Sequence, residues 1–362
     1  MSVFLVRSLP LSAPATATRP VPADLLPWAA AAWGRDAGVC TLAPVAGDAS
    51  NRRYFRLAAG RASVIVLEAP PATEKNAAFI SVLQLLAGQG VRVPALLAVE
   101  LERGYLLLED LGGQMLLPLL SADSVEAWYG RAGEVLLNLA QVAAEGRVPD
   151  YDRALLEEEL SRLPMWFFDR LLALPASAQA DDCVAEVKEL LVATALAQPR
   201  GFVHRDFHSR NLMVLGGDEL ALIDFQDATF GPATYDLVSL LRDCYIRWPR
   251  QRVEAWALAH RDALVGRQLL PPVDDATFLR WFDLMGLQRH LKVLGTFARL
   301  YLRDGKQAYL QDLPLVVTYV EEVLQSRRES EPVLARFHDW WLRVVRPVID
   351  SQAWMQPGRE PS

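Results

Sequence analysis

Apolar residues in the first third of the chain recur with two different periods. Residues 53–57 and 63–67 are short runs rich in aromatic and β-branched side chains, separated by a polar turn, which predicts a β-hairpin. Residues 79–86 instead place their apolar side chains on one helical face. Residues 93–99 and 105–108 are again strand-like. The order strand, strand, helix, strand, strand predicts a small sheet with one helix packed against it.

Longer helical periods dominate the rest of the chain. Three of them, over residues 128–144, 155–174 and 183–195, predict a mostly helical region. Residues 201–225 are the exception, because short apolar runs there alternate with polar residues and predict short strands with a site between them. Helices resume after this segment and continue to about residue 349.

These periods divide the chain into four segments. We expect a flexible leader at residues 1–23, a β-rich lobe at 24–110, a helical lobe at 111–350 and a flexible tail at 351–362. No window of roughly 18 residues is apolar without interruption, so the sequence predicts no membrane-spanning helix and no membrane partner.

Composition and charge mainly exclude certain classes of protein and of partner. Of 362 residues, 52% are hydrophobic and 22% are charged, which excludes disordered, collagen-like and coiled-coil classes. The net charge of -7 does not provide the basic field that nucleic acids require, so no nucleic-acid partner is expected. The cysteines, Cys40, Cys183 and Cys244, are odd in number and far apart, which is typical of reduced thiols in a cytoplasmic protein.

The strongest chemical signal is the run His-Arg-Asp-Phe-His-Ser-Arg-Asn at residues 204–211, followed by Ile-Asp-Phe at 223–225. In phosphoryl transfer, an Asp, an Asn five residues later and a second Asp after a strand have three distinct roles. Asp206 would accept the proton of the attacking hydroxyl. Asn211 and Asp224 would hold the magnesium ions that bridge the phosphates of ATP.

Two other interpretations of residues 204–211 are weaker. Asp and Asn also favour ordinary turns, but turn preference does not explain the combined His-Arg-Asp, the five-residue spacing and the downstream Asp. His204 and His208 could begin a zinc site, but no third ligand follows at a suitable spacing.

These motifs make the chain resemble the aminoglycoside phosphotransferase superfamily, the small-molecule branch of the protein-kinase-like fold. The resemblance extends to residues 106–111 and to 223–228 followed by 231–237. It implies an α+β bilobal fold with a small, β-rich, nucleotide-binding N-terminal lobe and a larger helical C-terminal lobe. It also implies that Glu109 and Leu111 lie at the hinge beside the adenine, and that Asp236 is structural.

Within the superfamily, three segments are most similar to bacterial amino-sugar kinases: residues 47–56, 68–71 and 284–295. That branch uses ATP and Mg²⁺ to phosphorylate the anomeric C1 hydroxyl of N-acetylmuramate and N-acetylglucosamine in peptidoglycan recycling. The resemblance therefore implies a small amino sugar as substrate. The sequence leaves the oligomeric state open, with a monomer expected.

The segment just before the predicted hairpin is the candidate nucleotide-covering loop. Its small residues would let backbone N–H groups approach phosphate, and its members are Gly47, Asp48, Ser50, Asn51 and Arg52. A plain surface turn is the alternative.

The phosphate-binding lysine of the kinase pattern is missing. Glu68 stands where the strand should carry Lys or Arg, and the helix at 79–86 offers no glutamate for the usual ion pair. The replacement charge could come from Arg52, Arg53 or Lys75, or from magnesium.

The substrate side is less well marked. A sugar bearing a lactyl group carries a carboxylate, for which an arginine fork is the best partner, and Arg205, Arg242 and Arg289 are candidates. Each could equally form a structural ion pair. His208 could bond a sugar hydroxyl or brace the loop.

Two further functions stay open. An aminoglycoside kinase would line its pocket with carboxylates to meet a polycationic drug, and few lie near the loop. A nucleotide-binding pseudokinase would explain Glu68 but not the joint presence of Asp206, Asn211 and Asp224.

Overall fold

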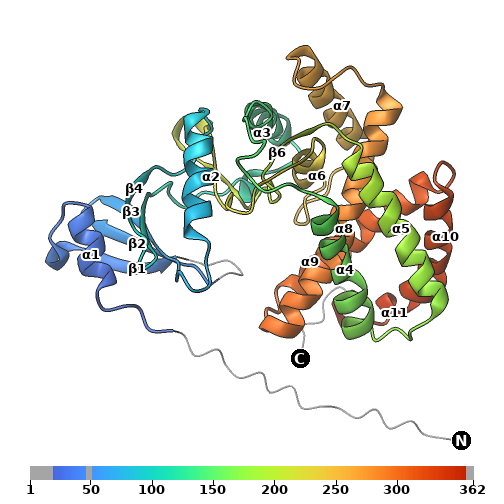
Figure 1. Cartoon of the computed structure of the whole chain (residues 1–362), viewed down its shortest axis with the longest axis horizontal. Helices are drawn as coiled ribbons and strands as arrows, with labels where there is room; N and C mark the ends of the chain where they lie inside the picture. The colour runs from blue at the N-terminus through green and yellow to red at the C-terminus, as the bar shows by residue number, and fades with distance from the viewer. Residues whose placement is uncertain (1–18, 46–50, 356–362) are drawn as a thin grey trace, which may run out of the picture.

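An antiparallel sheet forms the N-terminal end of the protein. The computed structural model describes residues 19–45 and 51–355, and within these ranges the sheet has five strands in the order β1-β2-β3-β5-β4 (Figure 1). Each strand is antiparallel to its neighbours. The strands are β1 (Thr41–Val45), β2 (Arg53–Ala59), β3 (Ala62–Glu68), β4 (Leu96–Glu100) and β5 (Tyr105–Glu109).

Two helices cover opposite faces of this sheet, because alternate strand residues point to opposite sides. On β3, Val64 and Val66 belong to the apolar cluster that includes α1 (Leu25–Ala32). Leu67, between them and the strand end, belongs to the main core with α2 (Asn76–Gly88). The predicted hairpin, helix and second strand pair are confirmed in outline.

α1 and β1 were not predicted from the sequence, and composition explains both omissions. The helix reads Leu-Leu-Pro-Trp-Ala-Ala-Ala-Ala, which has almost no polar positions and therefore no amphipathic period. β1 is an edge strand that contains Pro44 and is largely exposed, so it shows no alternation.

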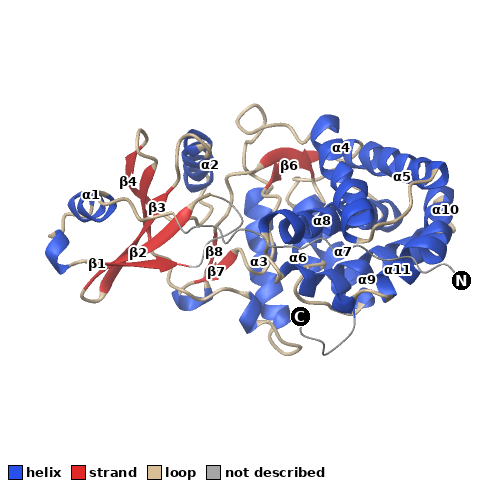
Figure 2. Cartoon of the chain, turned by 90° about the horizontal axis from the view of Figure 1, so that it is seen from below, coloured by secondary structure: helices blue, strands red, loops and turns tan. Residues whose placement is uncertain are grey.

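The helical region is organised around α8 (Asp275–Asp304) (Figures 1 and 2). The helices that pack against it include α4 (Arg153–Arg162), α5 (Ala178–Leu196), α6 (Tyr235–Leu241) and α9 (Tyr309–Arg327). The predicted helices are present, with α4 continuing as a π-helical segment, Leu163–Leu171. The other helices are α3 (Val125–Leu139), α7 (Arg250–Gly266), α10 (Pro332–Trp340) and α11 (Arg346–Asp350).

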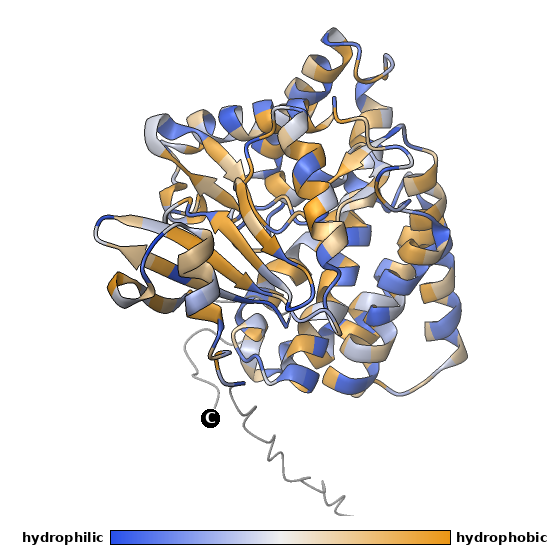
Figure 3. Ribbon diagram, turned by 60° about the vertical axis from the view of Figure 1, so that its left-hand side comes forward, coloured by the Kyte–Doolittle hydropathy of each residue, from blue (hydrophilic) through white to orange (hydrophobic). Residues whose placement is uncertain are grey.

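Hydrophilic and hydrophobic residues alternate along most helices (Figure 3). In α8, however, every residue from 282 to 295 is buried. That stretch includes charged side chains. Its Asp283 accepts from Arg242, Arg250 and Arg327, at 2.5, 2.9 and 2.6 Å. Such pairing is what allows charge to be buried. No helix in the described ranges has the length and apolar character needed to cross a bilayer, α8 included.

Two short strand pairs lie between the sheet and the helices. β6 (Arg200–Val203) pairs with β9 (Thr229–Pro232), and β7 (Leu212–Val214) pairs with β8 (Leu220–Leu222). The strands predicted within residues 201–225 are therefore present. Their pairing brings the loop at 204–211 beside the loop at 223–228.

Gly295 is where α8 crosses the junction between α4 and its π-helical continuation. A Cβ atom there would lie 2.3 Å from the carbonyl carbon of Arg162 and 2.6 Å from the nitrogen of Leu163. Because these are backbone atoms, a helix would have to move. We expect Gly295→Ala to lower the free energy of unfolding by about 1 to 3 kcal/mol, measured from denaturant midpoints.

Gly133, in the middle of α3, is the matched control, because a Cβ there meets nothing within 4 Å. Gly133→Ala should raise stability by about 0.5 to 1 kcal/mol through helix propensity. Equal effects of the two substitutions would contradict the close packing at Gly295.

Candidate active site

The loop between β6 and β7 is held by the carboxylate of Asp236, at the start of α6. That carboxylate accepts hydrogen bonds from the backbone N–H groups of His204, at 2.6 Å, and Arg205, at 3.0 Å. Arg205 has a φ of +75°, a left-handed conformation that costs free energy for any residue with a side chain. Asp236 therefore stabilises a strained turn, which is a structural role.

His204 braces the same loop from inside. Its Nε2 lies 3.1 Å from the carbonyl oxygen of Ile223, and its Nδ1 accepts from the backbone N–H of Asp206 at 3.3 Å. Burial lowers its pKa to about 4, so the ring is neutral. Since both nitrogens are engaged, His204 is not placed as a zinc ligand.

Asp206, Asn211 and Asp224 lie together, as the spacing predicts. The Asn211 Nδ2 donates to the backbone oxygen of Asp206 at 3.0 Å and lies 3.4 Å from Asp224 Oδ2. The other oxygen of Asp224 accepts from Gln226 at 2.7 Å, and the φ of Asp224 is +64°. With its amide nitrogen turned toward the loop, Asn211 has its oxygen available as a ligand.

This donor set fits magnesium better than zinc. Across the described residues, no group of three or more His, Cys, Asp and Glu side chains is arranged to hold a metal. Mg²⁺ is usually held by one or two protein oxygens, with phosphates and water as its other ligands. Asp224 and Asn211 can supply two such oxygens.

Asp206 is ionised at neutral pH. Burial would raise its pKa, but the positive charges of Lys292 and Arg205, together with His208, outweigh burial and lower the pKa to about 2. A carboxylate in this state accepts hydrogen bonds only, so it is able to bind a substrate hydroxyl and take its proton.

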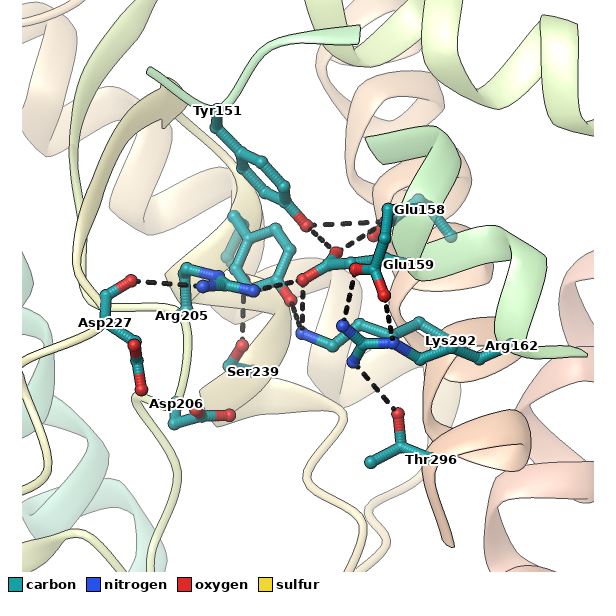
Figure 4. A network of polar contacts seen from close by, with 12 residues as sticks. Tyr151, Glu158, Glu159, Arg162, Arg205, Asp206, Asp227, Ser239, Lys292 and Thr296 are labelled. Atoms are coloured by element: carbon teal, nitrogen blue, oxygen red, sulfur yellow. Dashed lines mark hydrogen bonds and ion pairs between the residues drawn. The ribbon is translucent and has the colours of Figure 1, made fainter. Parts of the chain in front are cut away.

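Lys292 and Arg205 are positioned by Glu159, a fully buried residue of α4 (Figure 4). Glu159 accepts from Arg205 and from the hydroxyl of Tyr151, and it lies 3.2 Å from the Lys292 ammonium. Lys292 also donates to the Tyr235 hydroxyl at 2.9 Å. Burial opposes ionisation of Glu159, but these cations keep its pKa at about 2.

Sequence reasoning did not single out Glu159 or Lys292. Glu159 stands beside Glu157 and Glu158, which look equivalent by composition. The available signal was position, because Glu159 follows Leu156 by three residues and so lies on the buried face of α4.

A cavity of about 470 Å³ opens beside these groups. It brings together catalytic-loop residues, residues preceding α2, and one face of α8. Its lining includes Arg52, Thr73, Glu74, Lys75, Asp206, His208, Asp224, Gln226, Asp227, Cys244, Tyr245, Arg289, Lys292, Val293, Thr296, Phe297, Leu300 and Tyr309.

The predicted nucleotide-binding residues are only partly placed in this cavity. Gly47, Asp48 and Ser50 lie outside the described residues. Arg52 lines the cavity and forms an ion pair with Glu74 at 3.0 Å, and the Asn51 N–H donates to the same carboxylate.

At the hinge, the side chain of Glu109 turns away from the cavity. Its carboxylate pairs with Arg92 at 2.5 Å, and this bond lowers its pKa against the opposing effect of burial. Neither Glu109 nor Leu111 lines the cavity. Any contact from this hinge to an adenine would therefore come from backbone groups.

Glu68 does not occupy the position of a cleft-facing lysine, which corrects the expectation from the sequence. It alternates with Val64 and Val66 and so lies on the α1 side of the sheet. There it pairs with Arg53, its cross-strand partner, at 2.5 Å and with Arg19 at 2.6 Å. Residues 19–23 of the predicted leader are thus partly attached to the sheet.

The three candidate arginines have different surroundings. Arg205 pairs with Glu159, and Arg242 pairs with Asp283 at 2.5 Å, and neither lines the cavity. Arg289 does line it, and donates to the sulfur of Cys244 at 3.3 Å. His208 also lines the cavity and packs edge-on against Tyr245.

Comparison with known proteins places this geometry in a family. Residues 41–273 match the model of the phosphotransferase enzyme family, APH. A protein of Pseudomonas aeruginosa named N-acetylmuramate/N-acetylglucosamine kinase is 42% identical over 302 residues, covering 82% of this chain and 87% of that protein. A protein of the same name from Neisseria meningitidis is 36% identical over 296 residues, covering 80% and 87%.

Solved structures show the same fold at low sequence identity. Plasmodium vivax ethanolamine kinase superposes with a TM-score of 0.59 at 12% identity, covering 78% of this chain and 83% of that one. The ADP-bound aminoglycoside phosphotransferase APH(2'')-Ib gives 0.55 at 12% identity, covering 84% and 99%. The predicted α+β fold, with a smaller β-rich lobe and a larger helical lobe, is confirmed. The chain belongs to the phosphotransferase enzyme family and is a kinase of the aminoglycoside phosphotransferase type.

Proposed function

We propose that this kinase transfers the γ-phosphate of ATP to the anomeric C1 hydroxyl of N-acetylmuramate and N-acetylglucosamine, in cytoplasmic peptidoglycan recycling. The observation that carries the proposal is the grouping of Asp206 and Asp224 at one cavity, with Asn211 in contact with both. The two sugars are taken from the names of relatives, one of which is 42% identical to this chain. Residues 24–110 would bind the nucleotide, and 111–350 would carry catalysis and the sugar.

In this mechanism Asp206 accepts a hydrogen bond from the sugar hydroxyl and orients its oxygen toward the γ-phosphorus. Phosphoryl transfer has a loose transition state, so the proton leaves late and a weak base is sufficient. This agrees with a pKa of about 2 for Asp206. Positioning, rather than strong basicity, is then its main contribution.

Asn211 and Asp224 would hold Mg²⁺, which when bound neutralises phosphate charge and aligns the transferring group. Arg52 and Lys75 reach the same cavity from the sheet side and are candidates for the missing strand lysine. The loop of Gly47, Asp48, Ser50 and Asn51, and the hinge backbone at Glu109 and Leu111, would complete the nucleotide site.

The cavity charge argues against the two alternative functions. Among the described residues that line the cavity, carboxylates are not in the excess that a polycationic aminoglycoside would need. Four of these residues are carboxylates and four are cations: Glu74, Asp206, Asp224 and Asp227, with Arg52, Lys75, Arg289 and Lys292. A pseudokinase has no need for an ionised Asp206 beside an available amide oxygen.

The first test is Asp206→Asn, which keeps the shape of the side chain but removes its proton-accepting oxygen. We expect turnover to fall by roughly 100- to 10,000-fold, because base and orientation are lost together. The variant should still bind ATP, as measured by calorimetry. Asp218→Asn is the control, an exposed residue between β7 and β8, and should keep full activity. Near-normal turnover of Asp206→Asn would contradict the assignment.

The metal site is tested by comparing Asp224→Ala with Asn211→Ala. Asp224→Ala should abolish activity, whereas Asn211→Ala should raise the magnesium requirement and reduce activity less, since a neutral ligand provides less charge compensation. The measurement is initial rate against magnesium concentration, with a chelator to define the baseline. The opposite order of severity at saturating magnesium would refute these roles.

The position of phosphorylation is tested with two analogues. A sugar lacking only the anomeric hydroxyl should bind without accepting phosphate, and one blocked at the 6-hydroxyl should still be phosphorylated. Phosphorus NMR of the product from N-acetylglucosamine should show a sugar 1-phosphate. A 6-phosphate would overturn the C1 assignment while leaving the role of Asp206 intact.

A further inference from the structure

Arg289 is a buried cation directed into the cavity. It is 3% exposed, lies on α8 three residues before Lys292, and lines the same cavity as Asp206. Its hydrogen-bond partner is the sulfur of Cys244, a weak acceptor, at 3.3 Å. Within residues 19–45 and 51–355, no carboxylate lies within ion-pair distance of its guanidinium.

The contrast with its neighbours is informative. Arg205, within the catalytic loop, and Arg242, just after α6, each have a buried carboxylate as partner, Glu159 and Asp283. The guanidinium of Arg289 has five donors, and it is influenced by the charges of Asp206 and Asp243 without pairing with either. An anion that enters the cavity can therefore accept from the guanidinium.

The two sugars in the names of the relatives differ in whether they carry an anionic group. N-acetylmuramate carries a lactyl ether with a carboxylate, and N-acetylglucosamine has a neutral hydroxyl at that position. A planar guanidinium pairs with a carboxylate through two parallel hydrogen bonds, which gives both affinity and orientation.

We propose that Arg289 binds the lactyl carboxylate of N-acetylmuramate and thereby sets the preference between the acidic and the neutral sugar. This inference rests on the proposed sugar-kinase function. Asp206 and Arg289 line one cavity, so a single pyranose can present its reacting hydroxyl to the first and its acidic arm to the second. Arg289 is then a specificity residue, which adds only a minor share to the positive charge that lowers the pKa of Asp206.

The test is a specificity ratio. In Arg289→Gln, kcat/KM for N-acetylmuramate should fall by about 10- to 100-fold, mostly through KM, while kcat/KM for N-acetylglucosamine changes by less than about 3-fold. Retained activity on the neutral sugar also shows that the variant is folded. An equal loss on both sugars would overturn the inference, because Arg289 would then be structural or catalytic.

Arg303→Gln is the matched control. Arg303 is an exposed cation on the same helix, α8, where it pairs with Asp304 at 2.7 Å and is absent from the cavity lining. This substitution makes the same change in net charge and should leave the ratio of kcat/KM for the two sugars unchanged. A shift in that ratio as large as the one in Arg289→Gln would mean that general electrostatics, rather than a contact, sets the preference.

A second measurement changes the substrate. The methyl ester of N-acetylmuramate keeps the lactyl arm but not its charge, so the wild-type enzyme should use it about 10- to 100-fold less well, and Arg289→Gln should treat ester and acid alike. Equal use of ester and acid by the wild-type enzyme would overturn the inference while the sugar-kinase function stood. Failure of the wild-type enzyme on every one of these sugars would instead overturn the proposed function.

Discussion

The site depends on the interactions of one buried carboxylate, that of Glu159. It joins α4 to the catalytic loop through Arg205 and to α8 through Lys292, and it accepts from Tyr151. Glu159 has no exposed surface, so its charge is stable only while both cations are in place. Any movement of α4 or α8 would break contacts at the loop that carries Asp206.

The same cluster sets the charge of Asp206. Glu159 is one negative charge between two positive ones, so the group has an excess positive charge until Asp206 is counted. Burial would otherwise protonate Asp206, and Lys292 is the largest influence in the opposite direction. The ionised state of the proposed base is therefore a product of helix packing at a distance from the loop itself.

Local sequence was enough to predict much of this protein. The motif at residues 204–211, with Asp224 downstream, predicted the grouping of Asp206 and Asn211. The flanking strands are short, and the β7–β8 pair is enclosed in sequence by the β6–β9 pair. What could not be predicted was the part set by tertiary contact. Glu159 and Lys292 are remote from the motif in sequence, and their significance comes only from the crossing of α4 and α8.

Glu68 is a residue whose position was predicted from the sequence pattern but differs in the fold. Its place in the sequence pattern suggested the cleft, but a strand turns alternate residues to opposite faces, and one position decides the side. The neighbouring Leu67 faces the core with α2, so the strand offers no charge on that side. Any cation that meets a nucleotide must then come from outside the strand, and Arg52 and Lys75 are already directed into the cavity.

One helix unites the electrostatics of the site. Arg289, Lys292 and Thr296 follow one another on α8 at intervals of three and four residues, so they lie on neighbouring turns of one face. Lys292 faces Glu159 and influences the proposed base, while Arg289 lines the cavity without a carboxylate partner among the described residues. The helix is buried along this stretch, and the loop that carries Asp206 is held by the Asp236 carboxylate. Helix packing and these hydrogen bonds together set the distance between the base and the proposed carboxylate site. A substrate that carries its anion at another distance from the reacting hydroxyl would lose one of the two contacts, and this is how such a site could distinguish closely related sugars.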